Sequence, residues 1–357
     1  MKPLLFLIIF GSLVIRVFVS LVLLNDNVIL PPSDSTDFHN LAYELSNNFH
    51  FDNFYIGWIY SYWLSFFYSI FSNSRIVGFL LSWIVWLISA IYFKKVCTLL
   101  GFSNKQVKIY LFLYCFLPSS LFYASDTMRE AYQMLFLIFV VYFGINYIKF
   151  GKVSFFFKLF ISLFILCLLH HVFIGFSILI LAYFLLSKFT IKKSVFVFVI
   201  FSILFTFFGS LFKGYLIPSS SLSESVEKFN EIGRSLEANS TYPILFGTSN
   251  PVIGFFTNFL QYLLEPFPWR VKNFFDVVVF VENSLRFIFL FYTIKYVFNK
   301  KTRSKFDADL RFLLFCFFVM EVLWSLGTSN WGTAIRHHLP AVGVLLFLIG
   351  KLKSIKT

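Results

Sequence analysis

Charged and titratable side chains that could do acid–base or phosphate chemistry gather in four polar stretches of the chain. In the first stretch, Asp34 and Asp37 precede His39 at the start of a helix-like segment. A carboxylate in this position can cap the helix, or it can act as a general base toward a hydroxyl. A cap uses only one of the two aspartates. We therefore predict Asp34 as a catalytic base, with Asp37 as a second catalytic carboxylate and His39 as a substrate-binding residue.

The second stretch, residues 118–130, ends with the neighbouring charges Arg129 and Glu130 at the edge of an apolar run. Such a pair can lie among lipid headgroups without further purpose. It can equally hold a phosphate through the guanidinium and orient an acceptor through the carboxylate. We favour the second interpretation, with Arg129 binding phosphate and Glu130 taking part in catalysis.

The third stretch closes with Pro266-Phe267-Pro268-Trp269-Arg270. Two prolines exclude a regular helix here and favour an extended turn. We expect Trp269 to lie in the membrane interface and Arg270 to reach phosphate depth, since guanidinium groups bind phosphate well.

The fourth stretch places Arg336, His337 and His338 in a row where the last apolar run starts, a few residues after Trp331. A cationic site beside a membrane needs an anionic partner, and a lipid pyrophosphate is a natural one. Headgroup binding without catalysis is the alternative. We predict phosphate binding by the three basic residues, with Trp331 as a further substrate-binding residue.

His170 and His171 lie between two apolar runs. Adjacent histidines point in different directions on a helix, so this pair does not predict a metal site. We keep His170 as a substrate-binding candidate, while an ordinary interfacial histidine is the other interpretation. The four cysteines show no metal-ligand spacing, and we expect no disulfide.

These residues need a membrane to position them. The chain has 357 residues, of which 59% are hydrophobic and only 13% charged, more apolar surface than a water-soluble domain of this length could bury. A helical span needs about 20 apolar residues. We predict one integral membrane domain over 1–357, an all-α polytopic transmembrane helix bundle of about ten spans. The expected spans are 4–24, 76–93, 109–124, 131–148, 155–170, 172–187, 194–212, 280–298, 310–326 and 338–350.

The net charge of +13 is distributed in clusters beside the apolar runs. Lysine and arginine flank spans on the cytoplasmic side, so the clusters indicate membrane topology, and we expect no nucleic-acid partner. Both termini are then cytoplasmic, and the outer face receives 25–75, 118–130, 213–279 and 327–338. The aromatic run 54–71 is predicted as a helix lying in the outer interface, because a further span there would reverse the charge pattern.

The positions Asp34, Phe38 and Ala42 resemble the first-loop signature of GT-C membrane glycosyltransferases. Three further runs resemble a group of bacterial multispan proteins of surface-polysaccharide assembly that includes O-antigen polymerases. They are 117–120 with Arg129-Glu130, 266–269, and 332–338.

The resemblance implies transfer of a sugar or oligosaccharide from a polyprenyl phosphate or pyrophosphate donor to a glycan acceptor. The reaction would take place at the outer face of the bacterial cytoplasmic membrane. Polymerase and single-sugar transferase both stay open. No cofactor is expected, and a divalent metal is not favoured. Membrane lipid and a chain-length regulator or other assembly proteins are the expected partners.

A flippase or carrier for lipid-linked sugars is the main alternative function. A carrier needs charged side chains along a path through the bilayer, and mid-span charge is scarce here, with Arg16 and Glu321 the main examples. A structural subunit of an assembly complex is a third option, and it would have no need of Arg336. Charge gathered at one face favours an enzyme.

Overall fold

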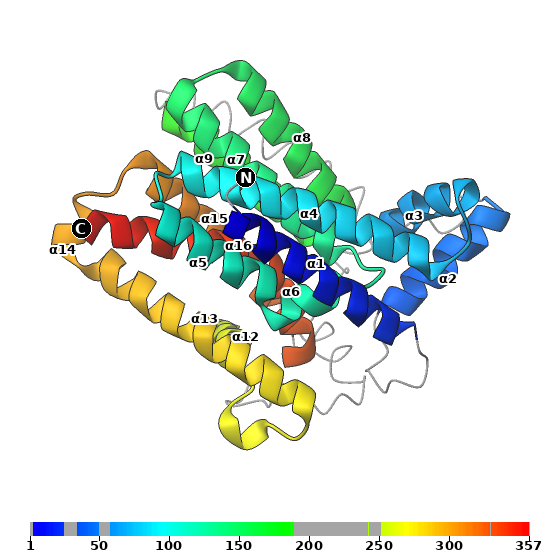
Figure 1. Ribbon diagram of the computed structural model, residues 1–357. Helices are drawn as coiled ribbons and strands as arrows, with labels where there is room; N and C mark the ends of the chain where they lie inside the picture. Colours follow the sequence, from blue (N-terminus) through cyan, green and yellow to red (C-terminus); the bar gives the residue numbers. More distant parts are fainter. Residues whose placement is uncertain are drawn as a thin grey trace. The chain divides into compact units, whose positions relative to one another are not determined.

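The computed structural model describes residues 3–24, 34–49, 58–188, 242, 251–328 and 330–356. Across these residues the fold is all-α, with fourteen α-helices and one short 3-10 helix (Figure 1). The chain divides into two compact units. Unit 1 comprises Met1–Phe173, Leu285–Phe317 and Arg336–Thr357, and unit 2 comprises Ile174–Ser284 and Phe318–Ile335. Each unit is described separately.

The helices before the long undescribed segment are α1 (Pro3–Leu23), α2 (Asp34–Asn47), α3 (Ile59–Ile70), α4 (Arg75–Leu99), α5 (Asn104–Phe116), α6 (Pro118–Tyr123), α7 (Glu130–Phe150), α8 (Val153–Leu169) and α9 (Val172–Lys188). Those after it are α12 (Pro251–Leu264), η2 (Pro268–Arg270), α13 (Phe274–Phe298), α14 (Lys300–Arg303), α15 (Ala308–Leu326) and α16 (Trp331–Lys356).

Three long helices of unit 1, α4, α7 and α16, run in the same direction. The start of α4 approaches the start of α7, where a Cβ on Gly78 would come within 2.7 Å of the Thr127 side chain. Their far ends also meet, since Lys149 of α7 donates a hydrogen bond to the Leu99 carbonyl. Late in α16, Phe347 stacks on Phe93 of α4 with ring centroids 4.5 Å apart. The beginnings of α4 and α7 and the part of α16 that starts at Arg336 therefore share one end of unit 1.

The predicted span 109–124 is wrong, because α5 ends at Phe116 and α6 starts at Pro118. Proline lacks an N–H and pushes the preceding residue out of helical geometry, and Leu117 accordingly has ψ 131°. Arg16 of α1 compensates for the break. Its guanidinium donates to the carbonyls of Cys115 and Ser120 and lies 4.0 Å from the centre of the Trp86 ring.

The predicted interface helix 54–71 corresponds to α3, which covers Ile59–Ile70, while 50–57 lie outside the described residues. The helix is amphipathic. Tyr60, Leu64 and Tyr68 are buried at helical spacing, whereas Trp63 and Phe66 are exposed. Its buried face packs against α2, for example through the Phe38 and Tyr60 rings, whose centroids are 5.2 Å apart. The pair α2 and α3 lies beside one end of α4 (Figure 1).

Five helices, rather than about ten, are long and apolar enough to cross a membrane among the described residues. They are α1, α4, α7, α13 and α16. The predicted runs 155–170 and 172–187 form the shorter helices α8 and α9, of 17 residues each, because the chain turns at His170 and His171. The run 310–326 lies in α15, whose buried Glu321 lowers its apolar character. The run 194–212 lies outside the described residues.

Replacing Arg16 by leucine should destabilise unit 1, because the carbonyls of Cys115 and Ser120 would lose a charged donor and keep only Ser12 Oγ and the Ala124 amide. We expect a loss of roughly 1.5–3 kcal/mol in unfolding free energy, the contribution typical of hydrogen bonds to a charged group. An equilibrium SDS titration of the purified protein in mixed micelles measures it. The matched control is Arg303→Leu, at an exposed position. Equal midpoints for both variants would contradict the capping role.

Candidate functional site

The candidate site lies in unit 1 and is centred on Arg336, close to the N-terminal end of α16. Around it gather Asp34, the first residue of α2, Glu130, the first residue of α7, and Arg129 just before it. The turn between α8 and α9 contributes His170 and His171, and α16 itself contributes His337. We call these seven residues the Arg336 cluster. Its core joins positions that are 206 and 302 residues apart along the chain.

The most deeply buried contact of the cluster is the ion pair between Arg336 and Glu130. The Nε and Nη2 atoms of Arg336 donate to Glu130 Oε1 at 2.9 and 2.8 Å. The Glu130 side chain is only 4% exposed. A buried charge of this kind is stable only when it is paired, and the positive end of the α7 dipole further favours the carboxylate.

One oxygen of Glu130 remains available within this pair. Glu130 Oε2 is buried and accepts no hydrogen bond from any residue that the structure describes. A buried carboxylate oxygen without a donor is costly, so the site has capacity for a ligand hydroxyl at this atom.

The second ion pair joins Arg336 to Asp34, with Nη2 of Arg336 donating to Oδ2 of Asp34 at 2.8 Å. Here the carboxylate is half-exposed, at 48%. Burial alone would raise the pKa of Asp34, but the charges of Arg336 and Arg129 outweigh it and lower the pKa below the ordinary 3.8. Asp34 is therefore ionised at neutral pH and is a weak base while the pair holds.

The histidines of the turn are neutral at pH 7. Burial is the largest cause and the positive charge of Arg129 the second largest. Together they hold the pKa of His170 well below 6.5 and lower the pKa of His171 to about 4. Nδ1 of His170 accepts a hydrogen bond from the Val172 amide at 3.2 Å, so Nε2 carries the proton. The His170 ring lies 4.3 Å from His171 and 6.1 Å from His337. These imidazoles can bind hydroxyls without adding charge.

Arg129 completes the cluster on the side of α2. Its Nη1 donates to the Leu169 carbonyl at 3.3 Å, and its guanidinium lies 5.2 Å from the centre of the Phe38 ring. The Arg336 guanidinium lies 5.8 Å from the Tyr123 ring. Phe38 and Tyr123 thus supply an aromatic edge to the site.

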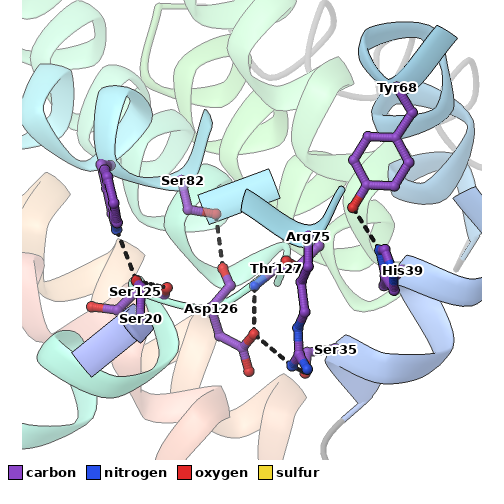
Figure 2. Close-up of polar contacts among 10 residues, drawn as sticks. Ser20, Ser35, His39, Tyr68, Arg75, Ser82, Ser125, Asp126 and Thr127 are labelled. Carbon is purple, nitrogen blue, oxygen red and sulfur yellow. Dashed lines mark hydrogen bonds and ion pairs between the residues drawn. The ribbon is translucent and has the colours of Figure 1, made fainter. Parts of the chain in front are cut away.

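Next to the cluster, the ion pair of Arg75 with Asp126 and a hydrogen bond from Arg75 to Ser35 fix the beginning of α2. Figure 2 shows these contacts. Nη2 of Arg75, the first residue of α4, donates to Asp126 Oδ1 at 3.0 Å and to Ser35 Oγ at 2.7 Å. Asp126 also accepts the Thr127 amide at 2.7 Å. Since Ser35 follows Asp34, Arg75 holds the backbone on which Asp34 stands. Arg75 is not among the site residues predicted from the sequence, although an arginine at the start of a long apolar run is a recognisable signal.

Three further predicted site residues are not part of the Arg336 cluster as defined above. Asp37 is exposed on the first turn of α2 and forms no ion pair with a described residue. His39 pairs with the Tyr68 hydroxyl through Nδ1 at 2.8 Å, and burial followed by the charge of Arg75 lowers its pKa (Figure 2). His338 is buried within α16.

The remaining predicted residues, Trp269, Arg270 and Trp331, belong to unit 2. Nη1 of Arg270 donates to the buried Glu265 at 2.9 Å, and its guanidinium lies 4.6 Å from the Trp331 ring centre. Trp269 is exposed and stacks on Phe267, with centroids 4.9 Å apart. A shared pocket for Arg270 and Arg336 stays a prediction, because the two residues lie in separate units.

The cluster can hold an anion and accept a proton. Its two carboxylates, Asp34 and Glu130, already form ion pairs with Arg336. Among the described residues, no group of three or more His, Cys, Asp or Glu side chains is placed to hold a metal ion. The residues of the cluster can themselves deprotonate a hydroxyl and stabilise a negatively charged group.

Removing Arg336 should leave Glu130 as an unpaired buried charge. We expect Arg336→Met to lower the unfolding free energy by roughly 3–5 kcal/mol, whereas the exposed Arg303→Met should change it little. Adding Glu130→Gln to the Arg336→Met variant should restore about 1–3 kcal/mol of unfolding free energy, because the two positions interact and the second change removes the unpaired charge. A double-mutant cycle by SDS titration measures this coupling. Strictly additive losses would argue against a buried ion pair.

Comparison with known proteins does not identify a family for this chain. No protein-family model matches it, and no curated protein matches it. The resemblance to GT-C glycosyltransferases drawn from short motifs therefore enters below as a proposal.

Proposed function

We propose that this chain is a membrane glycosyltransferase of bacterial surface-polysaccharide assembly. It would move a sugar or oligosaccharide from a polyprenyl phosphate or pyrophosphate donor to a glycan acceptor at the outer face of the cytoplasmic membrane. The observation that carries the proposal is the pairing of Arg336 with both Asp34 and Glu130 at the shared N-terminal end of α2, α7 and α16. This pairing puts a candidate base and a candidate phosphate ligand side by side.

The distribution of apolar side chains supports a membrane setting. Large apolar residues are exposed along α1, α4 and α8, among them Phe18, Ile84 and Phe164. Water would disfavour such faces, whereas lipid chains would cover them.

Charge along α4 supports the outer location of the site. Arg75 stands at its first residue, and Lys94 and Lys95 follow about 29 Å further along the helix axis, close to the thickness of the hydrocarbon core. Lys149 and Lys351 lie at this same end of unit 1, where they pair with Asp309 and Asp307. Lysine marks the cytoplasmic side, so the opposite end, with the Arg336 cluster, faces outward.

The geometry suggests how the donor activates the site. Glu130 anchors Arg336 through Nε and Nη2, while Nη1 makes no hydrogen bond with a described residue. An incoming donor phosphate can bind Nη1 and replace Asp34 on Nη2, because Asp34 is the more exposed of the two carboxylates. Arg336 then stabilises the leaving phosphate, and Asp34 loses the charge that lowered its pKa.

Released in this way, Asp34 can act on the acceptor. Its carboxylate takes the proton of the acceptor hydroxyl as the acceptor oxygen bonds to sugar C1. The bond between C1 and the phosphate oxygen breaks, and its electron pair leaves with the phosphate, which Arg336 holds. The neutral His170 and His171 would bind sugar hydroxyls, and the exposed Trp269 would stack on a sugar ring. A chain-length regulator or other assembly proteins would be further partners.

A carrier function has less support, because its best sequence evidence has a structural explanation. Arg16 is fully buried, and its hydrogen bonds go to groups of α5 and α6. Arg16 thus provides hydrogen bonds to the chain around the break at Pro118, which explains its charge without a path for substrate.

Activity should depend on Asp34 and Arg336 together. We expect Asp34→Asn and Arg336→Lys each to lower glycan transfer by on the order of 100-fold or more, since each removes a group that acts in the transition state. Surface polysaccharide, resolved by gel in cells that depend on the plasmid-borne protein, reports the activity. Single-repeat glycans would indicate a polymerase, and a missing side branch a single-sugar transferase.

Matched controls are Glu44→Gln, an exposed carboxylate on the same helix as Asp34, and Arg303→Lys. Immunoblots must show equal amounts of every variant in the membrane. Normal glycan length and amount in the Asp34 and Arg336 variants would refute the proposal.

A further inference from the structure

At the lysine-rich end of unit 1, a pocket of about 520 Å³ opens between α1, α4 and α7. Its apolar wall includes Ile9 of α1, with Ile91 and Leu99 of α4. Its polar wall is formed by Lys94, Lys95 and Thr98, and the Thr98 hydroxyl donates to the Lys94 carbonyl at 3.1 Å. The helices α1 and α4 lie side by side here (Figure 1). A site of this size and composition suits a headgroup with the beginning of a hydrocarbon chain.

The two ammonium groups of the pocket are not compensated by an acidic side chain. No carboxylate lines the pocket, and neither lysine forms an ion pair with a described residue. Lys149, beside Leu99, already uses Asp309 at 3.3 Å. Two positive charges against an apolar wall therefore call for an anion attached to something apolar.

The polar side of the pocket is also held in place. Nζ of Lys95 lies 4.0 Å from the centre of the Tyr92 ring. Tyr92 in turn packs against Tyr142, which lines the pocket, with ring centroids 5.2 Å apart. Lys94 is half-buried, and Lys95 is exposed. The ring contact therefore positions the Lys95 ammonium group at the edge of the pocket, where an anion can reach it.

We propose that this pocket binds the phosphate of an anionic phospholipid, with Lys94 and Lys95 holding the phosphodiester and Ile9 and Ile91 contacting the chain. A bilayer phospholipid fits because the pocket opens between two long apolar helices whose outer faces lipid would cover. The site lies about 29 Å along α4 from Arg75, and it is independent of the proposed transferase reaction.

The test measures lipid binding by native mass spectrometry of the purified protein in detergent. Dioleoylphosphatidylglycerol, dioleoylphosphatidylcholine and a polyprenyl phosphate are titrated separately. We expect saturable binding of the phosphatidylglycerol, weakened about tenfold or more by Lys94→Gln/Lys95→Gln. Lys94→Arg/Lys95→Arg should retain the binding.

The control is Lys152→Gln/Lys158→Gln, which removes the same charge from two exposed positions of the same basic end and should change binding less than twofold. Equal weakening by both glutamine pairs would show a general charge effect and overturn the site. Equal affinity for phosphatidylcholine would do the same. Binding of polyprenyl phosphate alone would overturn the phospholipid assignment.

Discussion

The ion pair of Arg336 with Glu130 is the contact on which the rest of the site depends. Glu130 is buried and Arg336 is half-buried near the N-terminal ends of parallel helices, where neither charge would be stable alone. Their pairing fixes α16 against α7 and leaves one edge of the guanidinium directed at α2. Asp34 occupies that edge from a half-exposed position. One arginine is thus held firmly by one carboxylate and loosely by another, an arrangement suited to exchanging the second for a substrate phosphate.

Arg75 makes this arrangement specific by fixing the start of α2. It holds Ser35 from the end of α4 and is itself held by Asp126. Two arginines from separate helices therefore bind adjacent residues of α2. The helix α2 also packs on α3 through Phe38 and Tyr60, which adds an apolar contact to these polar ones. Asp34 is positioned by tertiary structure and is not simply a helix cap.

Much of the site could be predicted from residue types at the edges of apolar runs. Asp34, Glu130 and Arg336 stood out because a charge beside a lipid-facing segment needs a reason. Their mutual pairing could not be derived, since it depends on three helices with distant sequence positions sharing one end. The count of spans was too high because hydropathy does not register the break at Pro118, and because the two runs that meet at His170 form helices of only 17 residues each. The role of Arg16 was missed for the same reason: its acceptors exist only where α5 ends.

A structure determined experimentally with a non-hydrolysable polyprenyl pyrophosphate analogue would test the exchange at Arg336 most directly. The account predicts phosphate oxygens on the guanidinium, with the Glu130 contact kept and the Asp34 carboxylate released toward the acceptor side. An analogue bound elsewhere, with the pair of Asp34 and Arg336 intact, would contradict it.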